Sequence, residues 1–223
     1  MYLIKQNKIT FEENYNGTSF CDIIQNHNEI NEIKIDEIYF GEYFNQDISL
    51  LPNYITKITF HYCSKFNKCI DFLPRELNHL TLGYDFNKRI DNLPNSLTHL
   101  KLGWNFNKPI DNLPKNLFDL WLGNSFSQSV DNLPKNLTHL KFGYCSTFNQ
   151  PLNNLPNKLN HLEFGEKFNQ QIDNLPSKLT HLTFGNCFNK PLNNLPDSLT
   201  YLGLSKNYKY LISVPCSVKI VRY

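Results

Sequence analysis

The chain has 223 residues with 22 basic and 20 acidic side chains, so its formal net charge is only +2. This balance singles out no partner, and we expect neither nucleic acid nor a membrane surface to be bound through bulk charge. No window approaches the roughly 18 apolar residues of a membrane helix, and the N-terminal residues lack a secretory signal pattern. We therefore expect a soluble protein in the cytoplasm.

The cysteines follow neither the spacing of a disulfide framework nor that of a zinc site. We expect them to be reduced thiols, and we expect no metal and no cofactor. The six cysteines are Cys21, Cys63, Cys69, Cys145, Cys187 and Cys216.

Residues 1–34 differ from the rest of the chain. Apolar residues alternate with polar ones at 2–4 and 9–11, and a short helix-like stretch follows Ser19. The regular part of the chain that comes next needs a cover for its first core residues and its first strand edge. We expect residues 1–34 to form an N-terminal cap.

A Phe-Asn step, followed seven residues later by Leu-Pro, recurs without a linker-like break. Its spacing of 20 or 22 residues is the interval of a leucine-rich-repeat coil. We expect residues 35–207 to form one β-rich solenoid, a leucine-rich-repeat-like superhelix with one short parallel strand per coil. The phenylalanines of the step are Phe44, Phe66, Phe86, Phe106, Phe126, Phe148, Phe168 and Phe188, and a weaker copy begins at Tyr208.

Each coil contains a short run of alternating apolar and polar residues, such as residues 77–82, which predicts one strand. Stacked coils then form a parallel sheet in which every second side chain points outward. The first outward column reads Glu37, Lys57, His79, His99, Asp119, His139, His161, His181 and Tyr201. The second reads Tyr39, Thr59, Thr81, Lys101, Trp121, Lys141, Glu163, Thr183 and Gly203.

A single coil has too few apolar residues to be stable alone, so stability must come from its neighbours. We expect the phenylalanines to stack as an aromatic spine. The asparagine after each phenylalanine is predicted to bond the backbone of an adjacent coil, as a structural ladder. The ladder residues are Asn45, Asn67, Asn87, Asn107, Asn149, Asn169 and Asn189. Ser127 replaces the asparagine once and predicts a local weak point.

The phrase Phe-Asn-x-Pro-Ile/Leu-x-x-Leu-Pro-x-x-Leu-x-x-Leu resembles the FNIP repeat, a leucine-rich-repeat relative of social amoebae and giant viruses of amoebae. Residues 106–110 and 188–192 are its nearest copies. The resemblance implies that the repeats bind substrates, often beside an F-box or a kinase domain. Residues 1–34 show no F-box-like pattern, so we expect a recognition module without its own F-box, in the host cytoplasm if the chain is viral.

Five histidines share the first outward column, on strands about 4.8 Å apart. Zinc needs converging ligands and these side chains run parallel, so we interpret them as imidazoles stacked towards solvent. A pH-responsive surface is an alternative, because close imidazoles resist joint protonation. The five are His79, His99, His139, His161 and His181.

Trp121 stands out in the second column, where Lys101 and Lys141 flank it and Asp119 lies beside it. An outward tryptophan among charges is typical of a binding hot spot. The alternative is packing against a neighbouring side chain such as Phe118. A second aromatic group follows the strands at Tyr84, Trp104 and Tyr144. Its two interpretations are a rim of the binding surface and ordinary exposed surface.

Residues 208–223 are expected to be a C-terminal cap, with a last strand at 218–221 whose free edge is open to a partner or to self-pairing. The varied outward columns favour a non-enzymatic scaffold that binds a protein partner on the outward face. No nucleophile, base and orienting group gather in one place, so we expect no enzyme. Self-assembly is the alternative, and nucleic-acid binding through Lys101, Lys141 and Trp121 is a weaker one.

Overall fold

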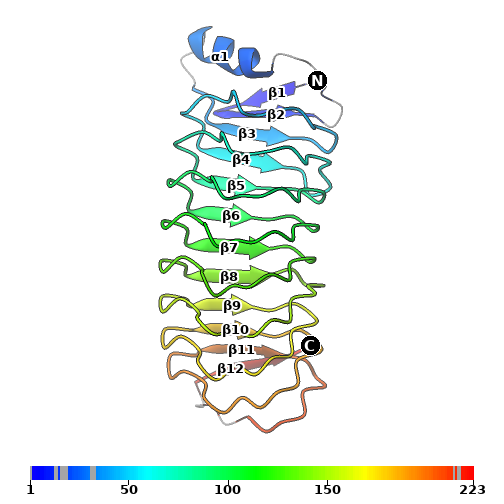
Figure 1. Cartoon of the computed structure of the whole chain (residues 1–223), viewed down its shortest axis with the longest axis vertical. Coiled ribbons are helices and arrows are strands. Elements are labelled where there is room, and N and C mark those ends of the chain that lie inside the picture. The colour runs from blue at the N-terminus through cyan, green and yellow to red at the C-terminus, as the bar shows by residue number, and fades with distance from the viewer. Residues whose placement is uncertain (1, 13–14, 16–19, 31–33, 213, 215–216) are drawn as a thin grey trace.

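The computed structural model describes residues 2–12, 15, 20–30, 34–212, 214 and 217–223. Ser19 and Cys216 lie outside this set. Within it, twelve strands form one sheet in sequence order, each beside the next (Figure 1). The pair β1 and β2 is antiparallel, and the pairs from β2 onward are parallel. The coils therefore stack as a β-solenoid, which confirms the fold class predicted from the repeat.

The strands are only three or four residues long, because each coil must turn away from the sheet to return for the next strand. They are β1 (Tyr2–Lys5), β2 (Lys8–Phe11), β3 (Glu37–Phe40), β4 (Lys57–Phe60), β5 (His79–Thr81), β6 (His99–Lys101), β7 (Asp119–Leu122), β8 (His139–Phe142), β9 (His161–Glu163), β10 (His181–Thr183), β11 (Tyr201–Leu204) and β12 (Lys219–Arg222).

Successive strands pair in register, so equivalent residues of neighbouring coils lie side by side. His79 pairs with His99, and Lys101 pairs with Trp121. The pairing continues from strand to strand, so both outward columns expected from the sequence are present, and Lys219 extends the first of them. The residues between the outward positions face the core, which produces the alternation of half-buried and buried side chains along the strands.

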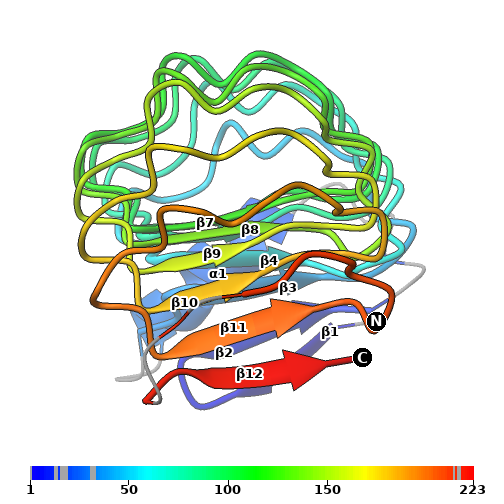
Figure 2. The same ribbon diagram turned by 90° about the horizontal axis from the view of Figure 1, so that it is seen from below.

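The interior lies between the sheet and the arch of return loops, as the view along the stack shows (Figure 2). Phe86, Phe106 and Phe126 stack there with ring centres 6.2 and 6.3 Å apart and ring planes within 5° of parallel. The same column continues to Tyr208, 5.9 Å from Phe188, so the predicted aromatic spine is confirmed. Burying one such ring contributes about 1.5–3 kcal/mol, and each ring obtains its neighbours only from other coils.

The ladder asparagines join consecutive coils along the return path. Each side-chain oxygen accepts a hydrogen bond from the backbone N–H of the equivalent residue one coil later, at 2.8–3.4 Å. Ser127 donates its N–H to Asn107 in the usual way. Its own short side chain has no oxygen in the place of an asparagine Oδ1, so the row is interrupted before Asn149.

The two coils of 22 residues gain their extra length directly after β4 and β8. Each places a fully buried serine there, Ser64 and Ser146. The hydroxyl oxygens accept hydrogen bonds from the N–H groups of Phe66 and Phe148 at 3.1 and 3.2 Å. The longer turn is thus tied to the spine by a side chain, a role that the sequence analysis did not assign.

The two ends of the stack differ. Helix α1 (Phe20–Ile30) lies over the end formed by β1 and β2 and buries Ile24 completely (Figure 1). At the other end β12 pairs with β11, one residue later than the strand expected at 218–221. Val218 is buried just before this strand. Among the described residues there is no helix with the length and hydrophobicity needed to span a lipid bilayer.

Candidate interaction surface

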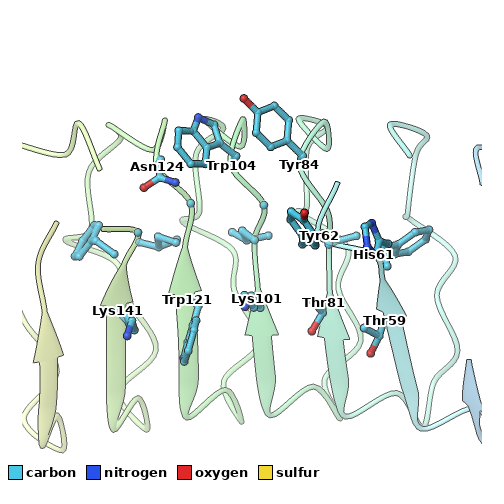
Figure 3. A pocket seen from close by; sticks show the side chains of 18 of the residues that line it. Thr59, His61, Tyr62, Thr81, Tyr84, Lys101, Trp104, Trp121, Asn124 and Lys141 are labelled. Carbon is cyan, nitrogen blue, oxygen red and sulfur yellow. The ribbon is translucent and has the colours of Figure 1, made fainter. Parts of the chain in front are cut away.

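Trp121 lies on β7 in the middle of the outward face, with one lysine against each side of its indole (Figure 3). The Nζ atom of Lys101 on β6 is 4.6 Å from the ring centre, and that of Lys141 on β8 is 4.7 Å away. Both contacts are cation–π interactions. Phe118, the neighbour considered above, packs edge-on against His99 with ring centres 4.4 Å apart.

The charges around this tryptophan are only partly compensated. Lys141 forms an ion pair of 2.7 Å with Glu163 on β9. Lys101 has no carboxylate within 4.0 Å among the described residues. The side chain of Trp121 is 38% exposed, so a partner can reach the edge of the ring although the lysines cover its faces.

Asp119 interrupts the histidine column between His99 and His139. Its Oδ1 atom is buried and accepts no hydrogen bond from the described residues. Leaving such an acceptor unpaired costs about 1–3 kcal/mol. Asp119 also divides the histidines of this column into two groups.

Each group of histidines is a parallel stack. His79 and His99 have ring centres 3.8 Å apart, and His161 lies 4.4 Å from His139 and 4.1 Å from His181. The ring planes differ by 10–17°, so the nitrogens run parallel instead of converging. In the part of the chain that the structure describes, no three His, Cys, Asp or Glu residues form a group that could hold a metal ion.

The residue before each histidine selects the tautomer of its ring. Thr98 donates its only hydroxyl proton to the carbonyl of Asn78 at 2.9 Å, and its oxygen also lies 2.9 Å from Nδ1 of His99. That second contact must be donated by Nδ1–H. Equivalent threonine or asparagine contacts at Nδ1 of the four other column histidines are found as well. We infer that the neutral rings carry the proton on Nδ1 and present Nε2 as an acceptor.

Burial also keeps two of these rings neutral. Desolvation lowers the pKa of His79, and the neighbouring His99 and Lys57 lower it further, while Glu37 and Asp119 oppose the shift. Desolvation likewise lowers the pKa of His161, with smaller contributions from His181 and His139. At neutral pH this part of the face therefore presents hydrogen-bond acceptors rather than positive charge.

Three hollows meet at Trp121. Their volumes are about 510, 450 and 180 Å³, and the indole lines all three. Lys101 lines the first and the third, and Lys141 lines the first and the second. The second hollow also reaches the stack of His139, His161 and His181. The structure thus brings together the residues that the sequence analysis selected from the two columns.

The largest hollow extends beyond the strand ends to a row of aromatic side chains. Tyr84 and Trp104 stack there with ring centres 5.5 Å apart, and Tyr144 lines the same hollow. Sequence reasoning did not place Tyr62 and Asn124 in this row. Both follow the strand at the same coil position as Tyr84, a pattern that could have identified them.

The fold resembles two solved structures. CroV588, a protein of a giant virus described as a novel circular LRR protein structure, is 35% identical over 99% of this chain and 41% of its own, with a TM-score of 0.69. YopM from Yersinia enterocolitica WA-314 is 18% identical over 82% of this chain and 45% of its own, with a TM-score of 0.50. The chain thus spans less than half the length of each. Fold and outward columns together define a solenoid of the leucine-rich-repeat type.

The sequence of the repeat identifies one family within this class of solenoid. The model of the FNIP Repeat matches residues 66–103, 86–125, 106–145 and 148–187, together more than half of the chain. No curated protein matches the sequence of this chain significantly. The chain belongs to the FNIP repeat family.

Proposed function

We propose that this protein is a non-enzymatic scaffold that binds a protein partner on the outward face of its sheet. The observation that carries the proposal is the position of Trp121, where three hollows with different linings meet. A partially exposed tryptophan bordered by hollows is the kind of residue that dominates binding energy in protein interfaces. A leucine-rich-repeat solenoid is typically used in this way, because it displays long rows of varied side chains on a rigid frame.

The surroundings of Trp121 supply the polar part of such an interface. Lys101 and Lys141 attract acceptors and carboxylates, and the Nε2 atoms of the histidine stacks accept hydrogen bonds. Apolar, donor and acceptor groups therefore alternate over a short distance, which favours specific binding over general adhesion.

The test is a quantitative pull-down from amoebal lysate with wild type, Trp121→Ala and the double variant His139→Ala/His161→Ala. The matched control is Phe72→Ala, which truncates an aromatic ring that is 72% exposed on a return loop. Circular dichroism checks that every variant is folded. We expect a partner that wild type and the Phe72 variant retain and that the other two lose. Equal retention by all four proteins would show that the outward face is not the binding surface.

The FNIP membership supports a recognition role, and we include the role of a substrate-recognition module in this proposal. We place it in the cytoplasm, which the free thiols of the five described cysteines support. If the protein is viral, this is the host cytoplasm.

Self-association is a second candidate, because the outer edge of β12 pairs with no strand among the described residues. Ile220 on this strand is 38% exposed, which adds an apolar contact for an added strand. Light scattering over a concentration series tests this, and Ile220→Pro, which removes a backbone donor from the outer edge of β12, is the matched variant. A mass that does not change with concentration would argue against self-association.

A further inference from the structure

The largest of the three hollows that meet at Trp121 is a groove along the carboxyl ends of β4 to β8, with a volume of about 510 Å³. One wall is formed by Trp121 with its two lysines, and the other by the aromatic row beyond the strands (Figure 3). The rings of this row are accessible, with 77% of Tyr62 and 68% of Tyr144 exposed. The groove therefore combines a charged wall with an aromatic wall.

The charges of the groove have one sign. Lys101 and Lys141 line it, and none of its lining residues is Asp or Glu. Glu163, which pairs with Lys141, belongs to the neighbouring hollow and lies outside the groove. Charge complementarity therefore favours an occupant with negative charge on the side that faces the lysines.

The aromatic row has a gap. Tyr84 and Trp104 stack in successive coils, and Tyr144 occupies the equivalent position two coils after Trp104. Asn124 stands between them, and its Oδ1 lies so close to the backbone that a Cβ on Gly143 would be 2.4 Å away. The amide therefore lies on the adjacent coil, and Asn124 contributes no ring to the row. Coils two strands apart are separated by about 9.6 Å, which is room for one ring at stacking distance from both neighbours.

We propose that the groove binds an extended acidic peptide segment of a partner protein, with one aromatic side chain inserted between Trp104 and Tyr144. The proposal rests on the scaffold function above and specifies its ligand. Lys101 and Lys141 are also two strands apart, at a spacing of about 9.6 Å. In a polyproline II segment, acidic side chains about three residues apart point the same way and lie about 9.3 Å from each other. Two such carboxylates can each meet one lysine.

A peptide fits these features better than a nucleic acid does. Single-stranded nucleic acid needs a row of cations that follows its phosphates, and this groove offers only Lys101 and Lys141. Glu163 and Asp119, which border the neighbouring hollow, would repel a longer phosphate chain. A peptide needs negative charge at only two points, which matches the number of lysines.

The experiment is selection of a displayed library of random peptides on the folded protein, followed by fluorescence anisotropy with the most enriched peptide. We expect enrichment of Asp or Glu three residues apart together with one Phe, Tyr or Trp. The double variant Lys101→Gln/Lys141→Gln is expected to weaken binding roughly ten-fold, because two ion pairs of modest strength with the peptide carboxylates are lost. Lys115→Gln/Lys135→Gln removes the same charge from exposed return-loop positions and is expected to bind like wild type.

Two further variants test the lysines and the aromatic row separately. Glu163→Gln frees Lys141 from its ion pair, and we expect it to strengthen binding about three-fold. Trp104→Ala removes one side of the ring slot and should weaken aromatic peptides while leaving their Ala-substituted versions unchanged. Enrichment of peptides without acidic residues, or equal binding by the Lys101/Lys141 variant, would overturn the proposal. So would tighter, steeply salt-dependent binding of a single-stranded RNA of mixed sequence.

The outcomes separate this inference from the scaffold function. If the pull-down yields a partner that depends on Trp121 but the selection yields no acidic peptides, the scaffold stands and the ligand class is wrong. If neither experiment finds a ligand that depends on this face, both proposals fail.

Discussion

Gly103 passes so close to the preceding coil that a Cβ atom at this position would lie 1.8 Å from the carbonyl oxygen of Gly83. The same approach recurs at Gly123, where the distance to the Gly103 oxygen would be 1.7 Å. None of the described glycines has a positive φ, so the requirement is for space and not for an unusual backbone conformation. The glycines that follow β5 to β10 thus let successive coils stack at the sheet edge.

We predict that Gly103→Ala lowers the free energy of unfolding by about 1–3 kcal/mol, because a backbone atom cannot move away as a side chain can. Gly203→Ala is the control, since the three atoms nearest to its Cβ would all belong to the side chain of Thr183, at 3.0–3.3 Å. Urea unfolding followed by circular dichroism measures both. Equal midpoints for the two variants would contradict the steric argument.

The asparagine ladder predicts a second stability effect. Asn87 accepts a hydrogen bond of 3.0 Å from the N–H of Asn107 and donates its own N–H to Asn67. Removing the acceptor with Asn87→Ala should cost about 0.5–1.5 kcal/mol of stability. Asn157→Ala changes an exposed asparagine outside the ladder and should stay within about 0.5 kcal/mol of wild type. Thermal unfolding of both proteins in parallel provides the comparison, and a larger loss for Asn157→Ala would count against the ladder.

The tautomer of the histidine column can be tested with Thr98→Val, which keeps the shape of the side chain and removes its hydroxyl. His99 then loses the acceptor for its Nδ1–H. We expect the ring to shift towards the Nε2–H tautomer, which the ¹⁵N chemical shifts of the two ring nitrogens report. Thr183→Val alters the second outward column and should leave the His99 spectrum as it is. An unchanged spectrum in Thr98→Val would show that the threonine does not hold the tautomer.

The lowered pKa values of His79 and His161 predict a pH dependence of stability. The ordinary pKa of a histidine side chain is 6.5, and burial places the folded-state pKa of both residues below it. As the pH falls below 6.5, the unfolded chain binds protons that the folded chain does not, so the free energy of unfolding decreases. The loss is complete once the pH is below the folded pKa, and the full contribution is present above 6.5.

Proton NMR titration of the imidazole signals measures these pKa values directly, and urea unfolding at several pH values measures the linked stability. The variant His79→Gln/His161→Gln should unfold with a smaller pH dependence just below pH 6.5. Titration midpoints at or above 6.5 in the folded protein would contradict the prediction.

Much of this molecule can be read from its sequence, because its regular features are local. The interval of 20 or 22 residues sets the coil, and two-residue alternation decides which side chains point outward. Once the coils are stacked in register, the columns and the phenylalanine spine follow without further information. The C-terminal strand begins one residue later than predicted, because the weak ninth repeat contains fewer of the residues that define a coil.

Only the tertiary structure shows how the outward side chains pack against one another. The sequence placed Trp121 beside Lys101 and Lys141, but only the packed rotamers show both of its faces covered. Nothing in the sequence indicated that Asp119 has a buried oxygen without a donor among the described residues, or that Asn124 lies against the neighbouring coil. These features depend on contacts between coils about 20 residues apart and on the space left between side chains. The repeat period determines the path of the backbone and the direction of each side chain. The hollows and the buried oxygen of Asp119 depend instead on how side chains of different size pack between neighbouring coils.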